Sequence, residues 1–270
     1  MQELERIARF YDLDYGDYTD DLDLYLNLAG RTGSPVLELG VGTGRVAVAL
    51  AKAGFAVTGI DSSPVMLGIA GGKVEPRMRL HLAQADMRDF HLDERFALAF
   101  FAVNTFMHLA TTQDRIRCLE SVHSHLERDG LLVMDLQNPD PARLAQEDKV
   151  VVLDWVRVDP ATGNTVLKMV SIASDSGLQI QDVTFVYDEV DGEGVVRRTV
   201  TSFPLCYAGL PEMELLLERC GFALEAVYGS YELEEFRGES ERMIVVARRA
   251  GSGRRPGGAR RQRKGTSDSQ

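Results

Sequence analysis

Short apolar runs alternate with longer amphipathic stretches from residue 35 to residue 136. This rhythm is typical of βαβ units and a parallel sheet. We expect strands over five apolar runs, at residues 36–39, 56–60, 80–83, 97–103 and 131–136. Helices are expected between them: over residues 45–53, from Pro64 behind the capping hydroxyls of Ser62 and Ser63, and over residues 113–126.

The pattern changes after residue 149 into four strand-like stretches that are separated by turns. They cover residues 150–158, 165–173, 178–187 and 195–203. Consecutive strands joined by short turns must be antiparallel, so these four are expected to form a meander. A helix over residues 211–220 and strands over 223–228 and 243–247 then resume the alternating pattern. The meander is therefore predicted to be an insertion into one α/β domain.

The segment before the first strand, residues 4–29, is rich in aromatic side chains and is expected to form helices over one end of the sheet. The predicted fold class is α/β. It is Rossmann-like, with a doubly wound seven-stranded and mostly parallel sheet, an inserted antiparallel β meander and an N-terminal helical cap. The domains that we expect are a cap at 1–34, an α/β domain at 35–149 and 206–250, the meander at 150–205, and a tail at 251–270.

Charge divides the chain into an acidic body and a basic tail. The whole chain of 270 residues carries a formal charge of −11, and 44% of its residues are apolar. Residues 251–270 hold six Lys and Arg side chains against one Asp, a net +5, which leaves −16 on the rest. Because such a body repels phosphate backbones, we expect no nucleic acid partner. The tail has too few apolar groups to pack, so we expect it to be disordered.

Hydropathy and cysteine usage point to a soluble protein. The longest apolar runs are far shorter than the ~20 residues that cross a bilayer, and the N-terminus does not resemble a signal peptide. We therefore expect a cytoplasmic protein that does not bind membranes. Cys118, Cys206 and Cys220 lack the spacing of a disulfide framework or a metal site and are expected to be buried thiols. The only oligomeric state that we consider besides a monomer is a homodimer.

The first strand runs into a loop with three glycines, Gly40, Gly42 and Gly44, preceded by the acidic Glu38. Glycines let the backbone turn tightly and let a ligand approach the helix N-terminus. The dinucleotide fingerprint Gly-x-Gly-x-x-Gly would need a glycine where the sequence has Arg45, which weakens the NAD alternative. A phosphate loop of the Walker type is excluded because no Gly-Lys-Ser or Gly-Lys-Thr follows.

Polar residues also follow the next three strands. Asp61 ends the second strand, where a carboxylate can accept both hydroxyls of a ribose. Asp86 follows the third strand and could accept a hydrogen bond from an adenine amine while Met87 packs on the ring. The fourth strand is followed by Asn104-Thr105-Phe106. Ligands of open α/β sheets bind at such strand ends, so four strands are expected to supply groups to one crevice.

At these residues the chain resembles the class I S-adenosylmethionine-dependent methyltransferases, over about residues 10–250. The segment 38–44 resembles the family's first motif, Asp61 its ribose acid, 85–87 its adenine contact and 104–106 its fourth motif. Segments 10–18 and 240–247 resemble a bacterial small-molecule subgroup. Glycine and amino-sugar N-methyltransferases of that subgroup share the meander and a tyrosine-bearing cap.

The resemblance implies S-adenosyl-L-methionine as the cofactor. The cofactor contacts that we expect come from the cap, the glycine loop and the strand ends: Tyr11, Tyr18, Glu38, Gly40, Gly42, Gly44, Asp61, Ser62, Met66, Asp86, Met87, Asn104 and Thr105. Since these groups are committed to the cofactor, acceptor selectivity must come from what covers the crevice. We therefore expect the meander and the cap to form a lid, with acceptor contacts from Tyr15, Phe106, Tyr187 and Phe203.

The expected reaction is methyl transfer to a nucleophile on a small molecule. The enzyme must mainly align donor and acceptor and exclude water. An amine acceptor needs only to be neutral, whereas a hydroxyl needs a base such as His108. The resemblance favours an amine nitrogen. The alternatives are an O-methyltransferase with His108 as base, an NAD-dependent oxidoreductase, and a noncatalytic nucleotide-binding module. The sequence shows no metal-ligand cluster, so metal-dependent O-methylation is disfavoured.

Overall fold

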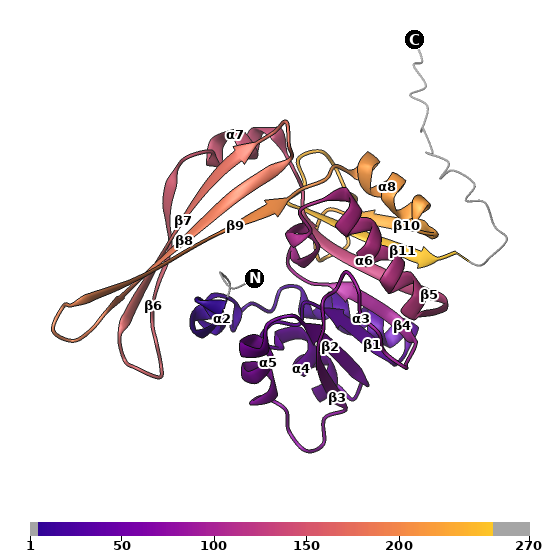
Figure 1. The fold of residues 1–270 in the computed structure, drawn as a ribbon, viewed down its shortest axis with the longest axis horizontal. Coiled ribbons are helices and arrows are strands. Elements are labelled where there is room, and N and C mark those ends of the chain that lie inside the picture. The colour runs from indigo at the N-terminus through magenta and orange to yellow at the C-terminus, as the bar shows by residue number, and fades with distance from the viewer. Residues whose placement is uncertain (1–4, 251–270) are drawn as a thin grey trace, which may run out of the picture.

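The computed structural model describes residues 5–250, which form a seven-stranded sheet flanked by helices and a separate four-stranded antiparallel sheet (Figure 1). The large sheet has the strand order β10-β11-β5-β4-β1-β2-β3. Its strands are β1 (Val36–Leu39), β2 (Val57–Asp61), β3 (Leu80–Gln84), β4 (Phe96–Phe101), β5 (Leu126–Gln137), β10 (Phe222–Tyr228) and β11 (Arg242–Arg249). β11 runs antiparallel to both of its neighbours, and the remaining pairs are parallel. The predicted Rossmann-like, mostly parallel sheet is confirmed.

Helices cover both faces of this sheet. The helices are α2 (Ala8–Tyr15), α3 (Leu22–Thr32), α4 (Arg45–Lys52), α5 (Pro64–Gly71), α6 (Thr112–His125), α7 (Pro141–Glu147) and α8 (Leu210–Arg219), with a 3₁₀ turn η1 (Thr105–His108). The side chains of α3 and α4 pack on one face of the sheet and those of α6 and α8 on the other. No helix within residues 5–250 is long and apolar enough to cross a membrane.

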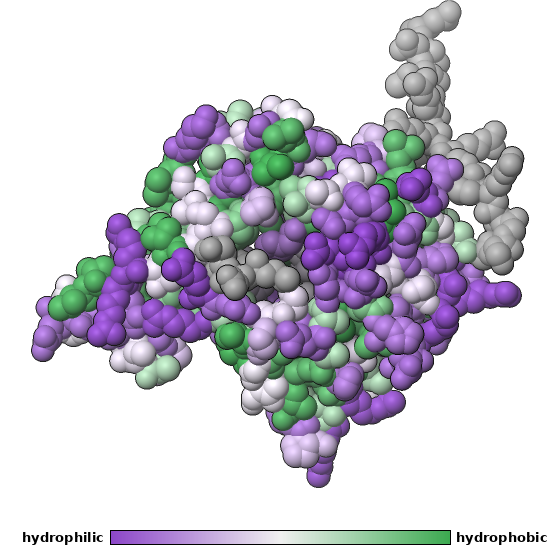
Figure 2. Space-filling model, in the orientation of Figure 1, coloured by the Kyte–Doolittle hydropathy of each residue, from purple (hydrophilic) through white to green (hydrophobic). Residues whose placement is uncertain are grey.

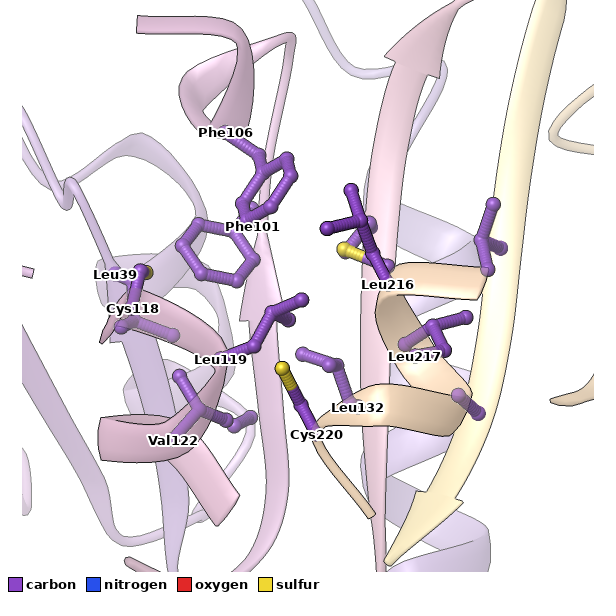
Figure 3. Packing of buried hydrophobic residues seen from close by; sticks show 14 of the residues in the cluster. Leu39, Phe101, Phe106, Cys118, Leu119, Val122, Leu132, Leu216, Leu217 and Cys220 are labelled. Carbon is purple, nitrogen blue, oxygen red and sulfur yellow. The ribbon is translucent and has the colours of Figure 1, made fainter. Parts of the chain in front are cut away.

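Strand β4 shows why the sequence of a central parallel strand is a continuous run of apolar residues. All six of its residues are buried. Leu98 and Phe100 face the cluster of α3 and α4, while Ala99 and Phe101 face the cluster of α6 and α8. Figure 3 shows Phe101 among side chains of α6, β5 and α8. Because both faces are covered, apolar side chains are needed at every position.

The small sheet has the strand order β6-β7-β8-β9, with β6 (Val151–Val158), β7 (Thr165–Asp175), β8 (Ile180–Val190) and β9 (Val196–Cys206), all antiparallel. The predicted meander is therefore present. The chain enters it from the end of β5 through α7 and leaves it into α8 (Figure 1). Helix α2 packs on one face through Phe10, whose ring stacks on Tyr187 with centroids 4.5 Å apart.

Three local features differ from the sequence pattern. β5 begins at Leu126, five residues earlier than expected, because Arg128-Asp129-Gly130 stays within the strand with Asp129 at φ +63°. The turn η1 was not predicted. Neither was α7, although Asp140 accepts a hydrogen bond from the Ala142 N–H and Pro141 starts the helix, which is a usual start signal.

Other expectations agree with the structure. Ser63 caps α5 by accepting a hydrogen bond from the Met66 N–H at 3.3 Å. Cys118, Cys206 and Cys220 are buried free thiols. The predicted basic tail lies outside the described residues.

Candidate cofactor and acceptor site

The glycine loop between β1 and α4 lies against both α2 and η1. Gly40, Gly42 and Gly44 have φ of +69°, +54° and +83°, a left-handed conformation that glycine adopts without strain. A Cβ atom on Gly40 would lie 2.3 Å from Thr105 Cγ2, and one on Gly42 would lie 3.6 Å from the Tyr11 ring. The fold thus brings two predicted site residues, Tyr11 and Thr105, to the loop.

Glu38 lies at the end of β1 with only 3% of its surface exposed. Its carboxyl accepts a hydrogen bond from the Ala47 N–H in the first turn of α4. Its Oε2 atom has no hydrogen-bond partner among the described residues, and burial raises the pKa of the carboxyl to about 8. Since buried polar atoms normally have partners, Glu38 fits a ligand that brings a donor or a cation to this loop.

Asp61 joins the glycine loop to the start of α5. Its carboxylate accepts the N–H groups of Gly42 and Ser63, both at 2.9 Å, and that of Ser62. Burial raises its pKa despite these bonds. A carboxylate has roughly four lone-pair positions, so three amides leave room for about one further donor. Asp61 is therefore fixed in place at the strand end, where it keeps acceptor capacity for a ligand hydroxyl.

Two carboxylates that sequence reasoning missed hold the N-terminal segment on this loop. Asp21, which is fully buried, binds Arg45 in a fork of two bonds of 2.5 and 2.6 Å. The same guanidinium donates to the Tyr18 carbonyl at 2.8 Å. Asp12 on α2 accepts from the Thr43 hydroxyl at 2.7 Å and from Lys73 Nζ at 2.8 Å. The available signal was Arg45 itself, a cation where the dinucleotide fingerprint has glycine.

Asp86 and Met87, the residues expected beside the adenine, contact other parts of the protein. Asp86 is paired with Arg88, at 2.6 Å between Oδ2 and Nη2, and this cation lowers the pKa of the carboxyl. Met87 packs against the core cluster of α6 and α8. Ser62 accepts a side-chain hydrogen bond from Gln84 on its carbonyl, and Met66 is buried. Contact of these four residues with the cofactor stays a prediction.

A buried polar network closes the carboxyl ends of β4 and β5. Asn104 has φ +64°, and its Oδ1 accepts from the Gln137 N–H at 2.7 Å. Asp135, fully buried, accepts from the Val103 N–H at 3.0 Å, from the Tyr231 hydroxyl at 2.9 Å and from Arg242 Nε at 2.8 Å. Sequence reasoning missed Asp135 and Arg242, although a carboxylate inside an apolar strand was a visible signal.

The predicted tyrosines of the cap lie along this edge. Tyr18 forms a side-chain hydrogen bond with Tyr231, which links it to the Asp135 network. Tyr11 and Tyr15 have ring centroids 5.0 Å apart, so Tyr15 lies next to the ring that faces Gly42. Burial raises the pKa of all three hydroxyls, which therefore stay protonated at neutral pH.

Beyond Tyr15 an aromatic wall continues onto the small sheet. Lys168 Nζ lies 5.9 Å from the Tyr15 ring centroid and 4.2 Å from that of Phe185. Phe185 contacts Phe203 edge to face at 5.1 Å, and Phe203 lies 5.5 Å from His108. Burial lowers the pKa of His108 to about 4. The wall connects η1, the small sheet and α2, and it contains three predicted residues, Tyr15, His108 and Phe203.

Tyr187, which we expected to contact the acceptor, does not line the aromatic wall. It is fully buried, and its hydroxyl donates to Asp14 on α2. The same carboxylate accepts from Trp155 Nε1 and from Lys168 Nζ, each at 2.8 Å. Tyr187 thus anchors α2 to the small sheet.

Phe106 also lies away from the wall. It is 2% exposed and packs edge to face on Phe101 at 5.2 Å, inside the core cluster shown in Figure 3. The sequence placed it next to the crevice, but the 3₁₀ turn η1 directs its ring into the core.

Within residues 5–250, His, Cys, Asp and Glu side chains form no group of three that could hold a metal ion.

Comparison with known proteins agrees with this geometry. Residues 36–130 match the family described as Methyltransferase domain. The chain is 29% identical over 251 residues to a putative methyltransferase, YqeM, of Bacillus subtilis strain 168, covering 87% of this chain and 91% of that protein. It is 34% identical over 108 residues to a glycine/sarcosine N-methyltransferase of Aphanothece halophytica, covering 39% of this chain and 41% of that protein.

The fold is also that of a solved methyltransferase. The structure of the CcbJ methyltransferase from Streptomyces caelestis superposes with a TM-score of 0.74 and 25% identity, over 86% of this chain and 90% of that one. The strand order, the glycine loop and the acids at the ends of β1 and β2 thus occur together with a matching methyltransferase domain. The protein is an S-adenosylmethionine-dependent methyltransferase whose methyltransferase domain includes residues 36–130.

Proposed function

We propose that the protein methylates an amine nitrogen of a small molecule. The observation that carries this proposal is the state of His108, the one base that sequence reasoning placed beside the acceptor. Burial lowers its pKa to about 4. A general base works best with a pKa near the working pH, so this imidazole is a poor base for a hydroxyl acceptor. An amine that arrives neutral needs no base.

The residues at the strand ends fit the cofactor. Glu38 offers a buried oxygen that has no hydrogen-bond partner within residues 5–250, and Asp61 offers a carboxylate held by three amides. The three left-handed glycines leave the helix N-terminus of α4 open to close approach. We infer that these groups and Tyr11 hold S-adenosylmethionine, which supplies a methyl group already activated on a sulfonium.

The protein contributes to the reaction by aligning donor and acceptor and by excluding water. With the cofactor bound, the methyl group would pass to the lone pair of the acceptor nitrogen, the electrons of the carbon–sulfur bond would stay with sulfur, and the ammonium product would lose a proton to solvent. The aromatic wall of Tyr15, Phe185 and Phe203 suits both states of the nitrogen, because aromatic faces exclude water and attract cations. The name of one relative, a glycine/sarcosine N-methyltransferase, supports nitrogen as the acceptor.

A panel of matched acceptors tests the proposal. Each amine, including amino acids, amino sugars and a short peptide with a free N-terminus, is paired with its hydroxyl analogue, and methylated product is measured by mass spectrometry. We expect product from amines only, and kcat/KM should rise with pH until the acceptor amine is neutral. Methylation of the hydroxyl partner at a comparable rate would contradict the proposal.

A variant of His108 gives the matched control. His108→Asn should retain within about tenfold of the wild-type kcat toward an amine, because no base is removed from the reaction. Loss of a general base typically costs 10²–10⁴-fold, so a drop of roughly that size would favour the O-methyltransferase alternative. Cofactor affinity measured in parallel shows whether the variant is folded.

A further inference from the structure

Two polar side chains of the small sheet have buried atoms without partners. Gln181 on β8 is 2% exposed, and Ser174 lies opposite it on β7. Among residues 5–250, neither Gln181 Nε2 nor Ser174 Oγ has a hydrogen-bond partner, although both atoms are shielded from solvent. A buried donor without a partner lowers the stability of a fold, so native proteins rarely keep one without a reason.

This pair faces the same side of the sheet as the aromatic wall. Side chains two residues apart on a strand share a face, so Gln181 and Val183 point the same way from β8. On β9, Leu205 lies opposite Gln181, and Phe203 lies opposite Val183. Gln181 and Ser174 therefore belong to the row that follows the row of Phe203, about 6.8 Å further along the strand.

The row of Gln181 lies at the end of the small sheet that joins the large domain. β9 ends there at Cys206, opposite Ile180, and the chain continues into α8 (Figure 1). Leu205 packs against the core cluster of α6 and α8, which places the row against the body of the protein. At the outstretched end of the sheet, in contrast, polar residues reach the surface, where water can pair with them (Figure 2).

Both side chains start from a backbone that is held in place. The Ser174 N–H donates to Asp148 Oδ1 at 2.8 Å. Gln181 lies on β8, which is paired on both sides, with Ser174 on β7 and Leu205 on β9. Groups that are fixed before a ligand arrives bind it with a smaller loss of conformational entropy. The pair is therefore arranged as a binding site would be.

The chemistry of the row suits an uncharged oxygen. Gln181 Nε2 offers two N–H donors and Ser174 Oγ offers one O–H donor, so their ligand must bring lone pairs. The row contains no charged residue, since its third member is Leu205. An ionised carboxylate would be buried there without a cation from the row, which is costly. A hydroxyl, ether or carbonyl oxygen fits the pair.

We propose that Gln181 and Ser174 bind a neutral oxygen of the acceptor and so select among amines, an inference that rests on the proposed N-methylation. With the acceptor nitrogen beside His108 and Phe203, the oxygen lies one row further along the sheet, about a six-membered ring away. The two residues do not touch the reacting atoms. They orient the acceptor and reject analogues that lack the oxygen, because such analogues leave buried donors unpaired.

Two amines that differ in one oxygen, trans-4-aminocyclohexanol and cyclohexylamine, test the proposal. Methylated product is followed by mass spectrometry to give kcat/KM for each. We expect the wild type to prefer the amino alcohol roughly 10- to 100-fold, the cost of leaving buried donors unpaired. Gln181→Met should lower this preference at least about fivefold, and Ser174→Ala by a smaller factor. The matched control, Thr184→Val, removes a hydroxyl from the opposite face of β8 and should keep the preference.

Melting temperatures separate a ligand-binding role from a structural one. Because Gln181 Nε2 has no partner among the described residues, Gln181→Met should leave the melting temperature unchanged or raise it. A lower melting temperature with an unchanged preference would mean that the amide holds a structural water, and it would overturn the proposal. A wild type that does not distinguish the two amines would do the same.

A second pair, trans-1,4-cyclohexanediol and cyclohexanol, separates this proposal from the proposed function. If oxygen is methylated and Gln181→Met loses the preference for the diol, the acceptor atom is not nitrogen but the oxygen site stands. If nitrogen is methylated and the preference for the amino alcohol survives in Gln181→Met, N-methylation stands and the oxygen site is wrong.

Discussion

At the scale of single residues, Arg45 is the side chain that separates this glycine loop from a dinucleotide loop. It forms a bidentate pair with the fully buried Asp21 and donates to the Tyr18 carbonyl. A guanidinium fork suits this role because it matches both carboxylate oxygens at once. Arg45 therefore holds the N-terminal segment on the loop, at a position where a dinucleotide loop leaves room for a pyrophosphate.

Breaking this pair should be costly. Arg45→Met leaves Asp21 buried without its cation, and we expect roughly 3–5 kcal/mol less stability, measured by urea unfolding. Lys73→Met removes the partly exposed partner of Asp12 and should cost about 1 kcal/mol or less. Equal losses in the two variants would mean that the buried pair contributes no more than a surface one.

Glu38 should make cofactor affinity depend on pH. Its pKa of about 8 means that the carboxyl is protonated in the free protein at neutral pH. A cationic ligand favours the ionised form, so the ligand expels the proton below pH 8 and its dissociation constant should fall as pH rises from 6.5 to 8.5. Calorimetry with S-adenosylmethionine measures this, and Glu38→Gln should abolish the slope.

The same group affects the stability of the free protein. A carboxyl whose folded pKa is raised binds more protons in the folded than in the unfolded state, so stability falls as pH rises from about 4.5 to about 8. Glu38→Gln should lessen that fall. An unchanged profile would show that Glu38 is not the titrating group.

At the scale of elements, the small sheet separates two aromatic residues that looked equivalent in the sequence. Phe203→Ala should change acceptor selectivity and KM while leaving cofactor affinity within about twofold, because Phe203 lies beside His108 in the aromatic wall. Tyr187→Phe should mainly lower stability, by roughly 1–3 kcal/mol, because a buried hydrogen bond to Asp14 is lost. Acceptor kinetics and urea unfolding of both variants measure this difference. The reverse assignment of effects would show that Tyr187 lines the acceptor site.

The elements also show how far the sequence could predict the structure. The central strands of the large sheet were predictable where they are short apolar runs between glycine or polar boundaries, as in β1 and β4. Helix α7 was missed because it is only seven residues long, and β5 was predicted too short because Gly130 looked like a turn. Short elements depend on tertiary contacts, which a local pattern does not contain.

The residues of the candidate site also fall into those that the sequence could predict and those that it could not. Residues at strand ends, such as Glu38 and Asp61, could be located because the topology of an open sheet fixes where strand ends lie. Their partners could not. The bonds from Arg45 to Asp21 and from Arg242 to Asp135 join residues 24 and 107 positions apart, and nothing in one sequence pairs them. Phe106 was misplaced because a 3₁₀ turn, not an extended loop, follows β4.

At the scale of the whole molecule, cofactor binding should stabilise the fold. S-adenosylmethionine binds the folded state and so should raise the melting temperature, whereas NAD at the same concentration should not. Asp61→Ala should reduce the rise more than Asp86→Ala does, because Asp61 holds the loop amides of Gly42 and Ser63. Thermal scans of the three proteins with each ligand measure the effect. An equal loss in both variants would contradict this ranking.

The basic tail should be dispensable. The last described backbone bond runs from the Ala250 N–H to the Gly221 carbonyl, so truncation after Ala250 preserves it. We expect methyl transfer and melting temperature to stay within error, since the tail lacks apolar groups for docking. A loss of either property in the truncated protein would show that its arginines contact the body or the substrate.

The contact between α2 and the small sheet also contains the one tryptophan of the sequence, Trp155, whose indole N–H donates to Asp14. Fluorescence excited at the long-wavelength edge of indole absorption therefore reports on this one contact, without a label and without emission from other tryptophans. If α2 moves away from the small sheet to admit ligands, the indole N–H loses its hydrogen bond to the Asp14 carboxylate and donates to water instead. The fluorescence emission of the indole then changes. Stopped-flow fluorescence would then give the rates of opening and closing during turnover directly from the native chain.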